Sequence, residues 1–327
     1  MARTAARFPA RVLRYVSWRA GRALEPAAPV ARRATAPLRL RPTFLVIGAQ
    51  KAGTTSLYSY LSRHPAILCA RPKEVHYFNV HYPLGDRWYL SHFPLATRGL
   101  VIRRRFGTPP AVGEVTPGYL FHPHAPERVH AVSPEMKLVA VLRDPVERAY
   151  SQYRMQVRGR GLEATGSFED ALERERLELP AELELLHEDP AYVSPTGLWR
   201  SYVARGRYAD HLDEWLSWFP LEQLLVVTSE ELRADPASAV ATIADFLGVP
   251  PWPADTYRLR SVSEYEPLPD ELRERLAAVF EPQSRRLEQL LGRKLPWTRP
   301  SVQAGYAATR PQLARAASIS AEGSGRA

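Results

Sequence analysis

The stretch Phe44-Leu-Val-Ile-Gly-Ala-Gln-Lys-Ala-Gly-Thr-Thr-Ser56 decides the fold of this chain. Its first four residues form an apolar run that is typical of a short strand buried on both faces. Small residues follow from Gly48 to Gly53, and a helical pattern then runs from Thr54 to about Arg63. Such a loop between a strand and a helix lets consecutive backbone N–H groups surround an anion. The stretch therefore predicts a phosphate-binding loop at the edge of an α/β sheet.

Two further segments repeat the order of apolar strand and helix. Residues 138–142 precede an Arg-Asp-Pro turn and a helical pattern, and residues 224–228 precede an acidic turn and a helical pattern near 237–247. Additional helical patterns lie at 208–219 and 269–291. Strands without polar alternation, each followed by a helix, indicate a parallel sheet that is covered on both faces. We expect one α/β domain with a central parallel sheet flanked by helices.

The basic residues of the chain are concentrated at its two ends. The formal net charge of the 327 residues is +9, and residues 1–41 contain ten arginines and a single acidic residue. Residues 298–327 are also basic, which leaves 42–297 with more acidic than basic side chains. This distribution argues against nucleic acid as a partner. We expect a domain at 42–297 between a basic, flexible N-terminal segment (1–41), linker-like from 23 to 41, and a disordered C-terminal tail (298–327).

The N-terminal segment has arginines at helical spacing, namely Arg3, Arg7, Arg11 and Arg14. A basic amphipathic helix here would rest on an anionic membrane surface, whereas the alternative is a loosely ordered basic leader. No apolar run approaches the roughly 18 to 20 residues of a membrane-spanning helix. The single cysteine, Cys69, has no partner for an internal disulfide, which suits a reducing compartment. We expect a cytoplasmic protein, either free or held at a membrane surface through residues 1–41.

Lys51 distinguishes the loop from that of enzymes that use nucleoside triphosphates. Gly48 and Gly53 have the spacing of a P-loop, but Thr54 and Thr55 follow where a Lys-Ser/Thr pair would stand. A purely structural turn would explain the glycines but would not need the lysine. The usual lysine does not precede the hydroxyl here, which disfavours a magnesium-dependent triphosphate site. We predict phosphate binding by this loop without a metal ion.

Two more segments carry groups suited to chemistry on a phosphate ester. In Lys73-Glu-Val-His-Tyr-Phe78 a carboxylate lies beside a lysine, which in isolation is typical of a solvated surface pair. In Val141-Leu-Arg-Asp-Pro-Val-Glu-Arg-Ala-Tyr-Ser151, Asp144 and Pro145 are suited to the start of a helix. Arg143 and the hydroxyl of Ser151 could bind one phosphate group together. The alternative is that the Arg-Asp-Pro turn only caps the helix.

Taken together, these segments resemble the family of sulfotransferases that use 3′-phosphoadenosine 5′-phosphosulfate (PAPS), over roughly residues 43–297. They are most similar to the heparan sulfate (carbohydrate) branch in a bacterial-type form. The resemblance implies that PAPS is the co-substrate and that Glu74 is the general base, with Lys51 stabilising the leaving phosphate. It also implies a role in binding PAPS for Lys51, Ala52, Gly53, Thr54, Thr55, Ser56, Arg143 and Ser151. His76 and His122 are the competing bases, because the cytosolic branch uses histidine.

Two departures from the heparan sulfate enzymes concern the acceptor. The sequence Glu-Val-Thr-Pro at 114–117 lacks the lysine that those enzymes carry, and Arg258 and Arg260 stand where they have a longer basic loop. These arginines either contact the nucleotide or face the solvent. We expect the acceptor to be a glycan, a glycolipid or a small metabolite, bound by variable loops such as 159–194. The alternative functions are a P-loop kinase-like phosphotransferase and a catalytically inactive nucleotide-binding adaptor.

Overall fold

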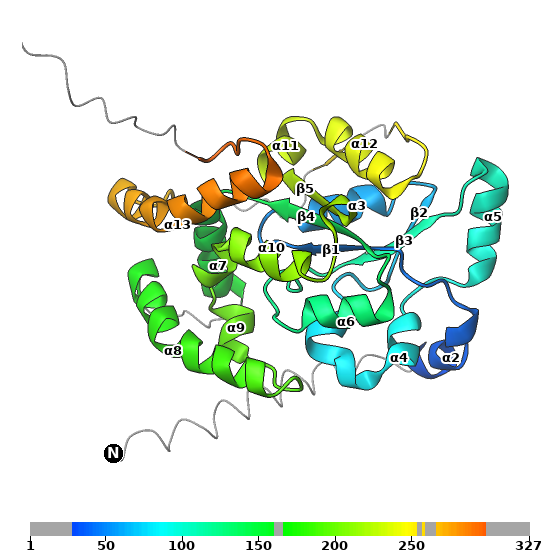
Figure 1. Ribbon diagram of the computed structural model, residues 1–327, viewed down its shortest axis with the longest axis horizontal. Helices are drawn as coiled ribbons and strands as arrows, with labels where there is room; N and C mark the ends of the chain where they lie inside the picture. The colour runs from blue at the N-terminus through cyan, green and yellow to red at the C-terminus, as the bar shows by residue number, and fades with distance from the viewer. Residues whose placement is uncertain (1–27, 160–165, 254–256, 259–265, 299–327) are drawn as a thin grey trace, which may run out of the picture.

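A five-stranded parallel sheet forms the centre of the molecule (Figure 1). The computed structural model describes residues 28–159, 166–253, 257–258 and 266–298. The strands are β1 (Phe44–Gly48), β2 (Ile67–Cys69), β3 (Ala111–Val115), β4 (Lys137–Leu142) and β5 (Leu224–Thr228). They pair in the order β2-β3-β1-β4-β5, and every pair is parallel. The predicted parallel sheet flanked by helices is confirmed.

Helices cover both faces of this sheet, with α11 and α12 above it and α4 and α6 below it in Figure 1. Those that match predicted patterns are α3 (Thr54–Leu61), α7 (Pro145–Gly159), α10 (Tyr208–Leu216), α12 (Pro236–Leu247) and α13 (Asp270–Leu291). The others are α2 (Ala28–Ala34), α4 (Asp86–Leu90), α5 (Ala96–Phe106), α6 (Ala125–Val132), α8 (Phe168–Glu188), α9 (Pro195–Trp199) and α11 (Ser229–Ala234). Short helical turns are η1 (Ala36–Leu38), η2 (Tyr77–His81), η3 (Tyr82–Leu84), η4 (Ala204–Gly206) and η5 (Leu221–Gln223). Across the described residues, no helix is both long enough and apolar enough to cross a membrane.

The prediction of loops over 159–194 is wrong for residues 168–188, which form the 21-residue helix α8. Ser167 and Asp170 begin this helix as a capping box, in which each side chain accepts from the backbone N–H of the other. Phe168 anchors the helix, because its ring lies 5.0 Å from that of Tyr153 on α7. The charged composition and an internal proline hide the helical pattern in the sequence. The acidic turn expected after β5 is likewise the start of a short helix, α11.

Residues 28–41, which the sequence analysis places in the N-terminal segment, contact the domain through the side chains of two arginines. Arg39 donates from Nη1 to the backbone oxygen of Phe93 at 2.5 Å. Arg32 donates from Nε to the backbone oxygen of Ser91 at 2.7 Å. Because these arginines donate to backbone carbonyl groups, the high arginine content of residues 28–41 does not mean that this segment is solvated. The predictions for residues 1–27, for Arg260 and for the tail from residue 299 onward concern positions outside the described residues.

Replacing Arg39 with alanine should lower the free energy of unfolding by about 1 to 3 kcal/mol, because the carbonyl of Phe93 would lose its donor. The same guanidinium also donates to Thr35 Oγ1 at 3.0 Å and to the backbone oxygen of Arg32 at 3.3 Å. Urea unfolding followed by circular dichroism measures this change. The exposed Arg41 supplies the control, and Arg41→Ala should unfold like the wild type. Identical midpoints for all three proteins would show that the segment does not stabilise the domain.

Candidate active site

The carboxyl ends of the parallel strands bring the predicted site residues to one edge of the sheet. The chain passes from β1 to β2 and β3 on one side of β1, and then to β4 and β5 on the other side. Open α/β sheets bind their ligands in the crevice that such a reversal of strand order creates. The loop at 49–53 follows β1, Arg143 follows β4, and the segment that follows β2 contains Glu74. The site is therefore built from three segments that are distant in the sequence.

The loop between β1 and α3 needs the glycines at its two ends, Gly48 and Gly53. Gly53 has a φ of +98°, in the left-handed region that favours glycine. Gly48 lies against Leu120, and a Cβ atom at this position would lie 2.6 Å from the Leu120 side chain. Lys51 also has a positive φ, of 71°, without being glycine. The backbone at Lys51 is therefore held in a costly conformation, which is common where a loop binds a ligand.

The N-terminus of α3 is suited to an anion. No side chain caps this helix, and its first turn contains no acidic residue. Its first backbone N–H groups and the positive end of the helix dipole are therefore available to a negative ligand. Thr54 and Ser56 are nearly fully buried in this turn, and Thr55 is partly exposed. All six positions predicted for the loop site, from Lys51 to Ser56, thus fall at the start of one helix.

Arg143 joins this loop from the end of β4. Its Nη1 donates to the backbone oxygen of Lys51 at 3.3 Å, and its Nη2 to Glu147 at 3.3 Å. The buried Nε has no hydrogen-bond partner. Burial, followed by the charge of Arg143, lowers the pKa of the Lys51 ammonium group. Two cations therefore lie together, as a site for a multiply charged anion requires.

The other residues that the sequence analysis considered for this region are Asp144, Ser151 and Arg258. Asp144 caps α7 by accepting from the backbone N–H of Val146 at 2.8 Å, as the sequence predicted. Ser151 is buried on the same helix. Arg258 is exposed. Of the two residues predicted for a phosphate, Arg143 thus lies two residues before α7 and Ser151 lies within it.

Glu74 lies beside the end of β3, where its backbone N–H donates to the oxygen of Val115 at 3.1 Å. Its carboxylate is paired with Lys73 and lies 3.4 Å from His76 Nε2. Burial opposes ionisation of Glu74, but the hydrogen bond from His76 and the charge of Lys73 outweigh it and lower the pKa to about 2. Glu74 and His76 both have left-handed backbone angles, with φ of 62° and 56°. The side chain is 37% exposed, so it remains accessible to an acceptor.

The two histidines that compete with Glu74 lie in different surroundings. His76 contacts Glu74 through Nε2, and its Nδ1 lies 3.2 Å from Asn79 Oδ1. His122 is buried, and neither of its ring nitrogens has a hydrogen-bond partner. Burial, and then the charge of Arg128, lower the pKa of His122 well below its usual value. His76 is thus part of the Glu74 cluster, whereas His122 lines a small pocket together with Asn79.

Glu114 is an important residue that the sequence analysis did not select. It is 1% exposed on β3, and both of its carboxylate oxygens accept from hydroxyl groups. Thr116 Oγ1 donates to Oε2 at 2.7 Å, and Tyr119 donates to Oε1 at 3.0 Å. A signal was present in the sequence, since a glutamate inside the apolar run Ala-Val-Gly-Glu-Val has to be satisfied by buried partners.

The hydroxyl groups bound to Glu114 also hold the backbone of the segment that contains Glu74. The Tyr119 hydroxyl accepts from the backbone N–H of Tyr77 at 2.8 Å. The Thr116 hydroxyl accepts from the backbone N–H of His76 at 3.4 Å. Both bonds fall within three residues of Glu74, where the chain adopts its left-handed angles. Through these two hydroxyl groups, Glu114 therefore holds the backbone next to Glu74, the predicted base.

Comparison with known proteins gives the family. Residues 41–265 match the model of the sulfotransferase domain, and the chain belongs to this family. Human heparan sulfate glucosamine 3-O-sulfotransferase 6 is 36% identical over 225 residues, which cover 68% of this chain and 57% of that protein. The membrane-associated sulfotransferase kil1 of Dictyostelium discoideum is 28% identical over 319 residues, covering 78% of this chain and 66% of that protein. The chain thus spans between about half and two thirds of these curated relatives.

A solved structure supports the same conclusion. The sulfotransferase from Alicyclobacillus acidocaldarius superposes with a TM-score of 0.59 and 33% identity, over 80% of this chain and all of that chain. The predicted family and the predicted fold are both confirmed. The catalytic and binding roles of individual residues stay predictions.

The buried carboxyl of Glu114 should make stability depend on pH. Burial raises its pKa to about 7, against the opposing effect of hydrogen bonds from Thr116 and Tyr119. The folded protein therefore holds this proton more tightly than the unfolded chain, so stability is lost as pH rises from about 4.5 to 7. Glu114→Gln cannot ionise. Relative to this variant, the wild type should lose on the order of 2 to 3 kcal/mol of unfolding free energy across that interval.

Urea unfolding of both proteins at four pH values between 4.5 and 7.5 measures the difference. Within this range, the difference in unfolding free energy between the wild type and Glu114→Gln should become constant only above pH 7, where the folded wild type has lost the proton. Parallel curves over the whole interval would contradict the raised pKa of Glu114.

Proposed function

We propose that this protein transfers a sulfuryl group from PAPS to a hydroxyl or amine group of an acceptor. The contact between Arg143 and the backbone of Lys51 carries the proposal. It places two cationic side chains beside the uncapped N-terminus of α3. Among the described residues Lys51 forms no ion pair, and Arg143 pairs only with Glu147. The membership of the sulfotransferase family gives the class of reaction.

In this proposal the two phosphate-bearing ends of PAPS bind to separate parts of the site. Lys51 and the first turn of α3, with the hydroxyls of Thr54, Thr55 and Ser56, would hold the 5′-phosphosulfate. Arg143 and Ser151 would hold the 3′-phosphate, and the unpartnered Nε of Arg143 leaves a donor for it. Recognition of the 3′-phosphate separates PAPS from ordinary adenine nucleotides.

Glu74 is the proposed general base, and Lys51 offsets the charge on the leaving phosphate. The acceptor oxygen or nitrogen forms a bond to sulfur while the bond from sulfur to the bridging oxygen breaks, and the acceptor proton passes to Glu74. With a pKa of about 2 the carboxylate is ionised at neutral pH. Its contact with Lys73 lowers its basicity, so loosening that contact would favour proton transfer.

A carbohydrate or glycolipid is the proposed acceptor. The human relative is named for sulfation of heparan sulfate glucosamine, and this supports a sugar hydroxyl as the nucleophile. Val115 stands where the heparan sulfate enzymes have a lysine, which argues against heparan sulfate itself. The kil1 relative is described as membrane-associated, which supports contact of the basic segment 1–41 with the cytoplasmic surface of a membrane.

The nucleotide specificity tests this proposal directly. Isothermal titration without Mg²⁺ should show binding of adenosine 3′,5′-bisphosphate (PAP), whereas ATP with Mg²⁺ should bind much more weakly. Arg143→Ala should weaken PAP binding by about 30- to 100-fold, since it removes a charge-assisted contact. It should hardly change the affinity for adenosine 5′-phosphosulfate, which lacks the 3′-phosphate.

Arg273→Ala is the matched control, because Arg273 donates to the other oxygen of Glu147 at 2.5 Å. This variant also removes a cation from Glu147 but leaves the loop untouched, so its PAP affinity should stay near that of the wild type. Tight binding of magnesium ATP, with equal losses for both adenosine nucleotides in Arg143→Ala, would instead indicate a P-loop kinase-like enzyme.

The proposed base is tested by Glu74→Gln, which keeps the size of the side chain but removes its basicity. Turnover with labelled PAPS and a panel of glycans, glycolipids and phenols should fall by roughly 10² to 10⁴, with PAP affinity nearly unchanged. His76→Asn and His122→Asn should reduce turnover less. Glu74 would not be the base if its glutamine variant kept more than about a tenth of wild-type turnover while a histidine variant was inactive.

A further inference from the structure

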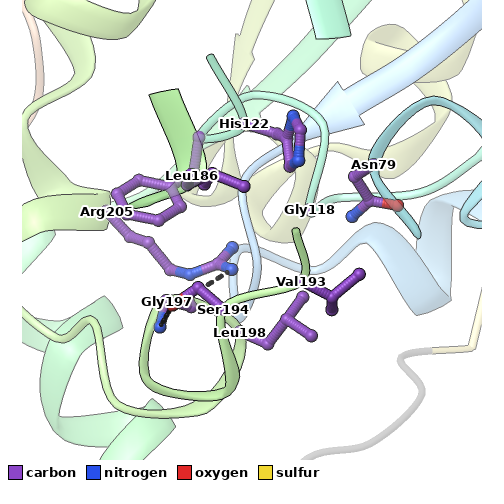
Figure 2. A pocket seen from close by; sticks show the side chains of 10 residues that line it. Asn79, Gly118, His122, Leu186, Val193, Ser194, Gly197, Leu198 and Arg205 are labelled. Carbon is purple, nitrogen blue, oxygen red and sulfur yellow. Dashed lines mark hydrogen bonds between the residues drawn. The ribbon is translucent and has the colours of Figure 1, made fainter. Parts of the chain in front are cut away.

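A small pocket adjoins the Glu74 cluster and contains polar groups that lack partners (Figure 2). It has a volume of about 20 Å³, which is room for roughly one water molecule or one small polar group. Asn79 from η2 and His122 from the segment after β3 form one side. Arg205 from η4 and Ser194 and Gly197 around the start of α9 form the other.

Two buried side chains of this pocket, Asn79 and His122, present three hydrogen-bonding atoms without partners. Asn79 is 3% exposed and His122 is 7% exposed. The amide nitrogen of Asn79 and both ring nitrogens of His122 are buried without a partner. A buried polar group without a hydrogen bond costs about 1 to 3 kcal/mol. Three such atoms around one cavity therefore indicate a place for a ligand rather than a packing defect.

Arg205 supplies a positive charge to the same cavity, and Figure 2 shows its guanidinium pointing into it. The side chain is 5% exposed and donates to two neutral groups, Ser201 Oγ at 2.7 Å and the backbone oxygen of Gly197 at 2.9 Å. Its guanidinium carbon also lies 4.7 Å from the ring centre of Phe121. Among the described residues no carboxylate forms an ion pair with Arg205. A buried guanidinium of this kind favours an oxyanion.

Nearby charges do not neutralise Arg205. Burial, and then the charge of Arg148, lower the pKa of Arg205 to about 9, while Glu175 and Glu74 act in the opposite direction. The guanidinium therefore remains charged at neutral pH. The influence of Glu74 also shows that the pocket lies within electrostatic reach of the proposed base.

The pocket is separated from Glu74 by the ring of His76. One nitrogen of that ring lies 3.4 Å from Glu74 and the other lies 3.2 Å from Asn79, which faces the pocket. Gly118 lines the pocket beside Asn79, and a Cβ atom at this position would lie 2.9 Å from the amide nitrogen of Asn79. A group in the pocket would thus lie across the ring of His76 from an acceptor hydroxyl at Glu74.

We propose that Asn79, His122 and Arg205 form an anchoring site for a carboxylate of the acceptor, close to the group that receives the sulfuryl. The inference rests on the proposed function, because it assigns the acceptor to the crevice beside Glu74. A carboxylate fits the small volume and accepts from the guanidinium, the amide and the imidazole at once. The acceptor is then an acidic molecule, such as a uronic acid glycoside, in which a carboxylate and a hydroxyl are a few bonds apart.

A matched pair of glycosides tests the site. With protein saturated by PAP, isothermal titration should show that 4-nitrophenyl β-D-glucuronide binds at least about tenfold more tightly than 4-nitrophenyl β-D-glucoside, as expected for one charge-assisted anchor. Arg205→Gln and His122→Phe should abolish this preference. His122→Phe is the safer variant for folding, because the nitrogens it removes have no protein partner. His130→Phe, on α6 and outside the pocket, should keep the preference.

The outcomes separate this inference from the proposed function. If the wild type fails to bind PAP, the proposed function itself is overturned. PAP binding together with equal binding of both glycosides, or binding of neither, would mean that the pocket holds only water and would overturn the anchoring site. A glucuronide preference that survives in both Arg205→Gln and His122→Phe would overturn it as well.

Discussion

The parallel pairing of β1 with β3 on one side and β4 on the other is the constraint on which the rest of the structure depends. Because all three strands point the same way, the segments that leave them emerge at one edge of the sheet. The backbone N–H of Ala49 donates to the oxygen of Val141 at 2.6 Å, which ties the start of the loop to β4. Arg143 follows two residues later and contacts Lys51. The cationic half of the site is thus a product of strand pairing.

The other half of the site depends on a buried network rather than on the sheet alone. Glu74 lies in a segment with left-handed backbone angles, and such angles persist only where the surroundings impose them. Glu114 does so through the hydroxyls of Thr116 and Tyr119. The site therefore has one carboxylate that is partly exposed and paired with a lysine, and a second that is buried beneath it. Their surroundings move the two pKa values in opposite directions.

Much of the fold could be predicted because β1, β4 and β5 are apolar runs, each followed by a helix. The position of Lys51 and Arg143 at one edge of the sheet could also be predicted, because both follow apolar runs that read as parallel strands. Glu114 and the strand around it were missed, because a glycine and a glutamate in five residues do not look like a strand. Arg205, like α8, could not be predicted, since burial of a charged side chain depends on tertiary packing that no local pattern encodes.

The missing side chain at Gly48 links the loop after β1 to the segment that carries His122. Leu120 occupies the space where a Cβ would be, and its backbone N–H donates to the oxygen of Ile47 at 2.8 Å. His122 follows two residues later. A larger residue at position 48 would displace Leu120 and, with it, the segment that carries His122. Gly48 thus couples the position of the loop after β1 to that of the segment at 120–122.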